Sequence, residues 1–150
     1  MIELPEACVE SDDFRASLVV KDPPSKGKLV VSNPDGKRLV YIKVDGYLFD
    51  GRQKCDRLVH VHGNNVEKDR VEHAIFVELK GMRVNDGLEQ LKETLNHTST
   101  WYERSVKKSC YLLTTKAPKL DGTGQRLKRM LEEKMRVDLK IKNLQWSIDV

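Results

Sequence analysis

Cysteine is scarce in this sequence of 150 residues, and long apolar runs are absent from it. The three cysteines, Cys8, Cys55 and Cys110, are odd in number and far apart, and no C-x-x-C pair occurs. Neither a disulfide framework nor a zinc site is therefore indicated, and buried or incidental thiols are expected. No apolar run approaches the roughly 20 residues of a membrane-spanning helix, and the N-terminus is acidic rather than signal-like. We therefore expect a cytoplasmic protein with no membrane partner.

The composition is that of a globular protein with a highly charged surface. Charged residues make up 33% and hydrophobic residues 39% of the chain. A chain of this length forms one domain with a substantial core, so we expect a single domain over 1–150. The net charge of +4 is compatible with a polyanionic partner, although many enzymes that never meet nucleic acid carry as much.

Short apolar segments separated by turn residues fill the first third of the chain. Lys28–Ser32 and Arg38–Val44 flank Asn33-Pro34-Asp35-Gly36, whose Pro and Gly favour a tight turn, so we predict a β-hairpin there. The same reasoning predicts a short helix or irregular lead-in over 1–14, an apolar run at 17–20, a second tight turn at 45–46 and a continuing β-meander at 47–49.

Strand and helix patterns alternate in the rest of the chain. Val84, Leu88, Leu91 and Leu95 form a helical stripe that Asn85 or Asp86 can cap. The remaining patterns predict strands at 54–62, 74–80, 109–115 and 137–142, and a basic helix at 124–136. The basic face of that helix is either solvated or a contact surface for a phosphate backbone. The expected fold class is α/β, of the α+β type, with a mixed sheet flanked by helices.

The apolar strand at Ala74–Val77 ends in two opposite charges, Glu78 and Lys80. Side chains alternate along a strand, so these two share a face about 6–7 Å apart, while Leu79 points into a core. A carboxylate and an amine at the end of a buried strand are costly to desolvate unless each has a partner or a task. The simpler interpretation is a solvated strand end. A second E-x-K sequence, Glu132–Lys134, lies within the expected helix and shows that E-x-K also occurs by chance in a chain this charged.

An antiparallel hairpin would bring a third charge to this strand end. Pairing 54–62 with 74–80 sets Asp56 beside Glu78 or Lys80, and any register that opposes Asp56 directly to either of them puts all three on one face. Gln90 lies on the following helix, on the side of Gly87 and Thr94, and is otherwise a plain surface amide. His60 and His62 alternate on one strand, but nothing at suitable spacing completes a tetrahedral metal site, so we interpret them as ordinary polar residues.

Asp56, then Glu78-x-Lys80, then Gln90 on the next helix resembles the PD-(D/E)XK nuclease superfamily, in particular its RecB-like branch. The resemblance covers roughly residues 38–95. It implies a restriction-endonuclease-like core, here with an N-terminal β-meander, and metal-dependent hydrolysis of phosphodiester bonds. DNA is the preferred substrate by analogy, RNA stays open, and a homodimer that cuts both strands is compatible with a small chain.

The resemblance also implies roles for the residues that carry it. Asp56 and Glu78, with the Leu79 carbonyl, would ligate Mg²⁺ or Mn²⁺, because these cations prefer oxygen ligands. Lys80 would orient the attacking water or stabilise transition-state charge, and Gln90 would position the water or the phosphate.

Two departures from the family pattern stand beside these roles. Thr94 occupies a place that the RecB-like pattern often gives to an aromatic residue. No metal-binding acid can be chosen among the N-terminal acids, of which Glu10 is one. The alternatives are a catalytically inactive module of the same fold that binds nucleic acid or a protein, and an α/β interaction domain whose charges coincide by chance.

Overall fold

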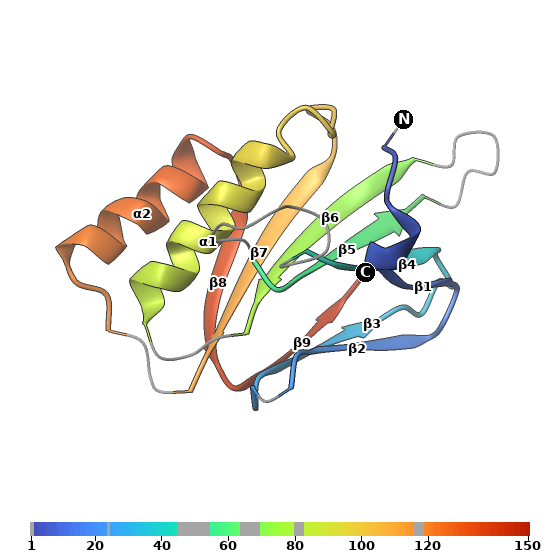
Figure 1. Cartoon of the computed structure of the whole chain (residues 1–150), viewed down its shortest axis with the longest axis horizontal. Coiled ribbons are helices and arrows are strands. Elements are labelled where there is room, and N and C mark those ends of the chain that lie inside the picture. The colour runs from blue at the N-terminus through green and yellow to red at the C-terminus, as the bar shows by residue number, and fades with distance from the viewer. Residues whose placement is uncertain (1, 24, 45–54, 64–69, 80–82, 116–118) are drawn as a thin grey trace.

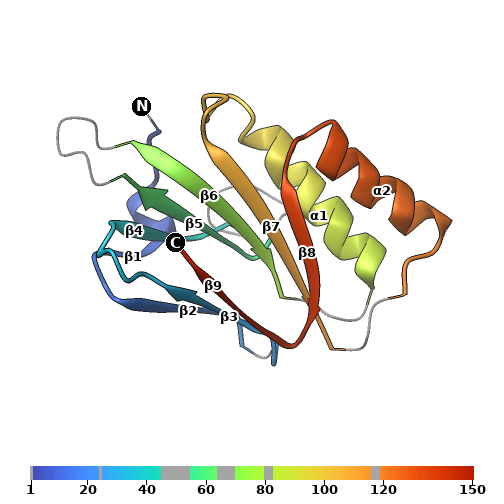
Figure 2. The same cartoon turned by 180° about the vertical axis from the view of Figure 1, so that it is seen from behind.

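The computed structural model describes residues 2–23, 25–44, 55–63, 70–79, 83–115 and 119–150, and these form three layers (Figure 1). The central layer is a six-stranded sheet with the order β1-β4-β5-β6-β7-β8. Helices α1 and α2 cover one face of this sheet, and a three-stranded sheet with the order β2-β3-β9 covers part of the other (Figure 2). The expected class, a mixed sheet with flanking helices, is confirmed.

The elements within the described residues have the following bounds. The strands are β1 Val9–Asp13, β2 Ser17–Lys21, β3 Lys28–Ser32, β4 Leu39–Lys43, β5 Arg57–His62, β6 Val71–Glu78, β7 Lys107–Thr114, β8 Asp138–Asn143 and β9 Gln145–Asp149. The helices are a 3₁₀ turn η1 at Glu6–Cys8, α1 at Val84–His97 and α2 at Gly122–Glu133.

Strands β5, β6 and β7 are buried on both faces, which explains why their sequences are nearly continuous apolar runs. On the helix side, Leu58, Phe76 and Leu112 share a core cluster with residues of α1 and α2. On the other side, Ile75 and Val77 pack in a second cluster with residues of the small sheet. The large sheet therefore separates two cores, and each buried apolar residue of a central strand belongs to one or the other.

Both helices begin at the same end of the large sheet. Strand β7 pairs parallel with β6, and β8 pairs parallel with β7, so α1 and α2 are the crossovers that join them. Crossover connections between parallel strands are almost always right-handed. Two consecutive crossovers that move in the same direction across the sheet therefore place both helices on the same face. The chain leaves β6 and β7 where α1 and α2 start, at the lower end of the helical layer in Figure 1. In open sheets with parallel strands, ligands bind at this end.

The predicted hairpin of Lys28–Ser32 with Arg38–Val44 is wrong. Strand β3 pairs with β2 and β9, whereas β4 pairs with β1 and β5, so the two segments belong to different sheets. The buried Asn33 redirects the chain between them: its amide donates to the carbonyls of Arg15 and Lys37 and accepts from the Lys37 N–H. A tight-turn sequence therefore forms a crossing between layers, and the strands expected to form one N-terminal β-meander are split between the two sheets. The turn expected at 45–46 and the continuation expected at 47–49 lie outside the described residues.

Two further strands differ from the sequence expectations. The lead-in over 1–14 contains the 3₁₀ turn η1, but its second half is the edge strand β1, which pairs antiparallel with β4. At the other end, β9 pairs parallel with β3 after the chain passes Leu144, whose φ is 51°. The Leu144 N–H donates to the Thr114 carbonyl of the large sheet, and its carbonyl accepts from Lys28 of the small sheet. Leu144 thus fixes the point where the chain changes layers.

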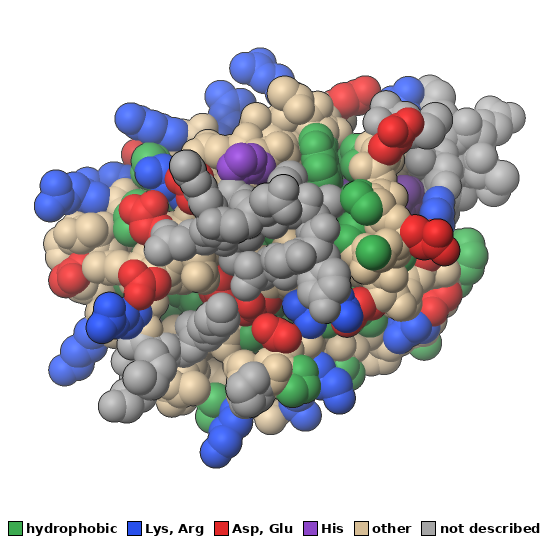
Figure 3. Space-filling view, in the orientation of Figure 1, with side chains coloured by type: hydrophobic (Ala, Val, Ile, Leu, Met, Phe, Trp, Pro, Cys, Tyr) green, Lys and Arg blue, Asp and Glu red, His purple; other side chains and the backbone are tan. Residues whose placement is uncertain are grey.

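Charges of both signs are mixed over the helical face. On α2, Lys128 pairs with Glu132 at 3.7 Å, one turn along the helix. In Figure 3, basic side chains lie around the margin of the molecule, with acidic side chains among them. The helix keeps an excess of basic side chains beside this pair, and both interpretations of its face, solvated or in contact with a phosphate backbone, stay predictions. None of the helices in the described part of the chain is long and apolar enough to cross a membrane.

Candidate functional site

Asp56 and Glu78 meet at one end of the β5–β6 pair. The register pairs Arg57 with Val77 and Leu58 with Phe76, so one more step sets Asp56 opposite Glu78. Glu78 lies two residues beyond Phe76 and therefore points toward the helices, as Phe76 does. Both side chains are buried, with exposed fractions of 1% for Asp56 and 0% for Glu78. The predicted hairpin is confirmed, and its register, extended by one step, puts these two carboxylates on one face.

A hydrogen bond from the backbone holds the Asp56 carboxylate. Its Oδ2 accepts from the Leu79 N–H at 2.8 Å, which ties the residue before β5 to the residue after β6. A carboxylate that accepts a backbone N–H is stabilised in its charged form. Asp56 is thus fixed as an acceptor within the structure, immediately beside Glu78 in the register.

The Leu79 carbonyl, the third expected metal ligand, contacts the small sheet. Ser25 Oγ donates to this carbonyl at 2.5 Å and accepts from the Gly27 N–H at 3.2 Å. The connection between β2 and β3 therefore reaches across to the end of β6. A carbonyl oxygen has two lone pairs, and Ser25 occupies one of them. Lys80, which directly follows, lies outside the described residues.

Helix α1 packs closely over Glu78 because Gly87 has no side chain. A Cβ at this position would lie 2.5 Å from Leu112 Cδ1 and 3.4 Å from Glu78 Cγ. Glu78 and the first turns of α1 are therefore in contact. Bringing a helix this near to a strand end requires a residue without a Cβ.

Gln90 lies on the strip of α1 that faces the two carboxylates. It follows Gly87 by three residues and precedes Thr94 by four, so all three share one side of the helix. Gly87 meets Glu78, and Thr94 meets Cys55, the neighbour of Asp56. Gln90 is half-buried and lies between these two contacts along the helix.

Thr94 makes the contact that sequence reasoning missed. Its Oγ1 accepts from the Cys55 N–H at 2.8 Å and donates to the Gln90 carbonyl at 2.9 Å, and the side chain is fully buried. The sequence pattern marks Thr94 as a residue on the side of Gln90 and as the place of an absent aromatic residue, but not as a partner of Cys55. The available signal was a hydroxyl beside the apolar stripe of the helix, where it must find a partner.

The Cys55 thiol is held in its neutral form. Burial raises its pKa well above the ordinary value, the nearby Thr94 hydroxyl lowers it somewhat, and the charges of Glu78 and Asp56 raise it again. A nucleophilic thiol needs the opposite environment, which stabilises the thiolate. Cys55 is accordingly a packing residue beside the site.

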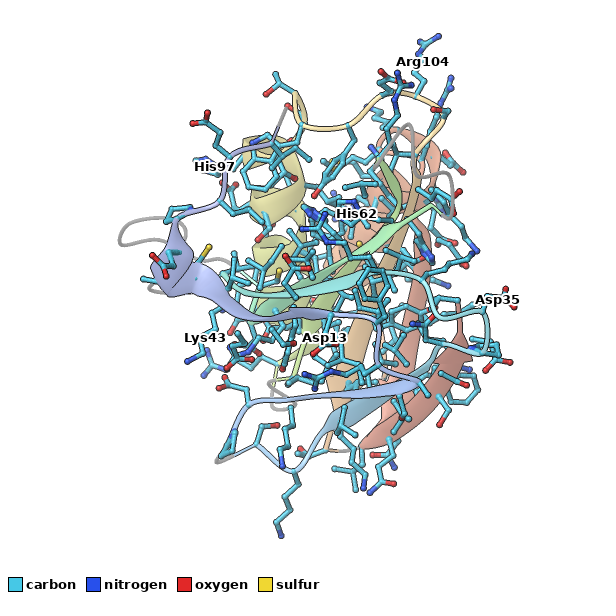
Figure 4. All side chains as sticks on the ribbon, turned by 90° about the vertical axis from the view of Figure 1, so that its right-hand side faces the viewer. Asp13, Asp35, Lys43, His62, His97 and Arg104 are labelled. Atoms are coloured by element: carbon cyan, nitrogen blue, oxygen red, sulfur yellow. The ribbon has the colours of Figure 1, made fainter. Side chains whose placement is uncertain are left out.

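Glu10, one of the N-terminal acids considered as a metal ligand, has basic partners instead. It pairs with Lys43 at 3.3 Å and with Arg57 at 3.6 Å, and Arg57 also pairs with Asp22 at 3.1 Å. Arg57 opposes Val77, whose side chain faces the small sheet, so this network lies on the opposite face from Glu78. Figure 4 labels Lys43 on the β1 side of the molecule. Glu10 therefore does not join Asp56 and Glu78.

The two histidines of β5 contact aromatic residues. His60 Nε2 and Tyr102 Oη share a hydrogen bond of 2.6 Å, and the His60 ring packs edge-on against Trp101 and Tyr102. Burial, with a smaller effect of His62, lowers the pKa of His60 to about 3, so its imidazole is neutral at pH 7. Interpreting these residues as ordinary components of the strand agrees with these contacts.

The donor set fits a magnesium-like ion better than a transition metal. Among the described residues, no group of three or more His, Cys, Asp or Glu side chains is placed to hold a metal ion. The Asp56 and Glu78 carboxylates are two hard oxygen donors, and Mg²⁺ is commonly bound through one or two carboxylates while it retains several waters. Two buried carboxylates side by side also repel each other unless a cation or a proton lies between them.

We compared the chain with known proteins by sequence and by structure. No protein-family model, no curated protein and no solved structure matches it.

Proposed function

We propose that this protein is a metal-dependent nuclease that hydrolyses phosphodiester bonds, with DNA as the preferred substrate. The observation that carries the proposal is the placement of Asp56 and Glu78, both buried, on one face at the end of adjacent strands. Gly87 and Thr94 of α1 contact this end of the two strands, which we call the Asp56–Glu78 corner. Gln90 lies between Gly87 and Thr94 along the helix. These contacts, together with the order of hairpin, motif and Gln-bearing helix along the chain, support the proposal.

Asp56 and Glu78 would hold Mg²⁺ or Mn²⁺, with the Leu79 carbonyl as a further oxygen donor. The bound ion would lower the pKa of a coordinated water and polarise the phosphate. The Lys80 amine would stabilise negative charge that develops on the phosphate, because a fixed cation is most effective where water is excluded. The Gln90 amide, on the strip of α1 facing the carboxylates, would orient the water or the phosphate by hydrogen bonding.

The wider features of the chain agree with a nucleic-acid substrate. A net charge of +4 favours approach to a polyanion, and both helices begin at the sheet end where Glu78 lies. We further propose that the protein acts in the cytoplasm, where buried reduced thiols such as Cys8 and Cys110 are the usual state. A homodimer would supply the second site that cleavage of both DNA strands requires.

An inactive binding module of the same fold is the second candidate. Two hydrogen bonds at the corner favour it, because they occupy two of the expected metal-binding groups. The Asp56 carboxylate accepts from the Leu79 N–H, and the Leu79 carbonyl accepts from Ser25. Both groups therefore contribute to the structure without a metal. Such a module would bind DNA in EDTA and never cleave it.

A cleavage panel tests the proposal directly. The parent is incubated with plasmid, single-stranded DNA and RNA, each with Mg²⁺, Mn²⁺ or EDTA. We expect cleavage only with a metal ion. We expect Lys80→Ala to reduce the rate by about 10² to 10³, the usual effect of removing one charge-stabilising group. Glu78→Gln, which keeps the volume of the buried side chain, should lose at least as much.

Glu132→Gln is the matched control, because Glu132 belongs to the other E-x-K sequence and is exposed on α2. It should cleave at the parent rate. A parent that cleaves none of the three substrates, or a Glu78→Gln variant as fast as the parent, contradicts the proposal. A gel shift in EDTA without cleavage under any condition selects the inactive binding module.

A further inference from the structure

The hydroxyl of Thr94 connects helix α1 to the backbone just before Asp56. Its Oγ1 lies 2.8 Å from the Cys55 N and 2.9 Å from the Gln90 carbonyl oxygen, and it accepts from the first and donates to the second. The side chain is fully buried, so water cannot replace either partner. Removing the hydroxyl would leave the Cys55 N–H without an acceptor inside the protein.

Cys55 directly precedes Asp56, which in turn directly precedes strand β5. From here the chain of contacts continues: the Asp56 carboxylate accepts from the Leu79 N–H at 2.8 Å, and Leu79 directly follows Glu78. Three hydrogen bonds therefore run from the Gln90 carbonyl through Thr94 and the Cys55–Asp56 backbone to the end of β6. They fix the helix that carries Gln90 and the two strands that carry the carboxylates.

We propose that Thr94 is a positioning residue for the carboxylate pair, holding the Cys55–Asp56 backbone so that Asp56 lies opposite Glu78. This inference rests on the proposed function only where it concerns metal affinity. The link from Thr94 to Asp56 exists in the metal-free protein and can be tested there. Groups that orient a metal ligand commonly change metal affinity by about 10- to 100-fold when they are removed.

Thr98, the C-cap of the same helix, is a matched control. It is also buried, and its Oγ1 donates to the carbonyls of Thr94 and Leu95. Thr98→Val therefore deletes a hydroxyl of the same kind one turn away, without touching Cys55. Thr94→Val keeps the shape of the side chain and removes its hydrogen bonds, while Thr94→Ser retains the hydroxyl.

The first measurement is amide hydrogen exchange without metal, read at Cys55 and at Leu79. We expect Thr94→Val to speed exchange of both amides about fivefold or more relative to Thr98→Val, because each loses about one hydrogen bond of protection. Thr94→Ser should restore the parent rates. If the Leu79 amide exchanges equally in Thr94→Val and Thr98→Val, the Asp56 carboxylate does not depend on Thr94, and the inference is wrong.

The second measurement is the dissociation constant for Mn²⁺, determined by electron paramagnetic resonance without substrate. We expect about a tenfold or greater weakening in Thr94→Val, parent-like binding in Thr98→Val and recovery in Thr94→Ser. Equal weakening in both valine variants would indicate a general loss of structure and overturn the inference. If the parent binds no Mn²⁺, the proposed function fails, and the exchange experiment still decides the role of Thr94.

Discussion

Buried ionisable side chains on the helix-facing side of the large sheet show how local surroundings determine charge. His60 lies two residue pairs along β5 from Leu58 and faces the same way, but its partners are aromatic rather than charged. Its imidazole therefore stays neutral, because burial penalises the charged form more than any neighbour stabilises it. The carboxylate of Asp56, which directly precedes the same strand, instead accepts the Leu79 backbone N–H.

The lowered pKa of His60 predicts that the protein loses stability in mild acid. The unfolded imidazole titrates near pH 6.5 and the folded one at about 3, so the unfolded state binds more protons between these values. The contribution of His60 is therefore complete above about pH 6.5 and falls by about 1.4 kcal/mol per pH unit below it. Urea unfolding at pH 7 and pH 5 should show the parent losing about 2 kcal/mol more than His60→Gln between these two pH values.

His73 provides the comparison for this measurement. Burial, followed by the nearby Lys107 and Lys37, lowers its pKa to about 4, so it contributes acid sensitivity of the same sign in the parent and in the variant. Only the difference between the two proteins reports on His60. Parallel pH dependences in parent and variant would show that His60 is protonated as readily in the folded protein as in the unfolded one.

At the scale of elements, the distance between α1 and the large sheet determines how closely the helix approaches Glu78. Gly87 sets this distance, because its missing Cβ lets the helix approach Leu112 and Glu78. The apolar stripe of α1 predicts which side of the helix faces the sheet, but it does not predict how close the helix comes. That closeness is a property of two elements packed together.

Gly87→Ala should therefore destabilise the protein, although alanine favours helices. Its Cβ would meet Leu112 Cδ1 at 2.5 Å, and Leu112 is fully buried and cannot move away freely. Overpacking of this kind costs about 1–3 kcal/mol, more than the gain of about 0.5–1 kcal/mol in helix propensity. Chemical denaturation measures the difference.

Gly122→Ala is the control for this change. Gly122 begins α2, and a Cβ there meets no atom within 4 Å. This substitution should be neutral or stabilising by up to about 1 kcal/mol. If both alanine variants are equally stable, α1 can move away from β6 without cost, and the close packing at Glu78 is not a constraint.

At the scale of the whole molecule, two sheets and a helical layer enclose the corner from both sides. Ser25, from the connection between strands of the small sheet, reaches Leu79 on one side, and Thr94 of α1 reaches Cys55 on the other. The corner is thus assembled from segments of the chain that are far apart in sequence. A ligand bound there should stabilise the entire fold rather than one element.

Thermal unfolding with and without metal tests this coupling. At a Mg²⁺ or Mn²⁺ concentration 100 times the dissociation constant, binding adds about 2.7 kcal/mol of stability. For a chain of this size, each kcal/mol raises Tm by about 2–4 °C. We expect a rise of about 5–10 °C in the parent and little in Asp56→Asn.

Asp86→Asn serves as the control, because Asp86 is an exposed acid on α1 whose partner is Arg83, at 4.0 Å. It should show the rise of the parent. A rise of equal size in Asp56→Asn would place the ion elsewhere in the protein, and no rise in the parent at millimolar metal would count against the site.

Residue patterns predicted the strands and helices of the central part of the fold, and they predicted that Asp56 and Glu78 lie at one end of the β5–β6 hairpin. Glu78 could be placed because strand periodicity fixes the face of each residue, and Asp56 because an antiparallel register leaves only two choices of face. The hairpin at Asn33 failed for a different reason: Pro and Gly indicate a turn but not which sheet receives the next strand. Strand β9 was missed because its pairing with β3 joins opposite ends of the chain.

The sequence by itself determined the alternation of strands and helices in the central part of the chain and the face on which Glu78 lies at the end of β6. Both follow from periodicities of two and 3.6 residues, which are local properties of the backbone. Only the tertiary structure decided that Thr94 holds Cys55, that Ser25 holds the Leu79 carbonyl, and that Glu10 faces away from Glu78. These contacts join residues 39, 54 and 47 positions apart, and no local pattern encodes which distant partner a polar group will find.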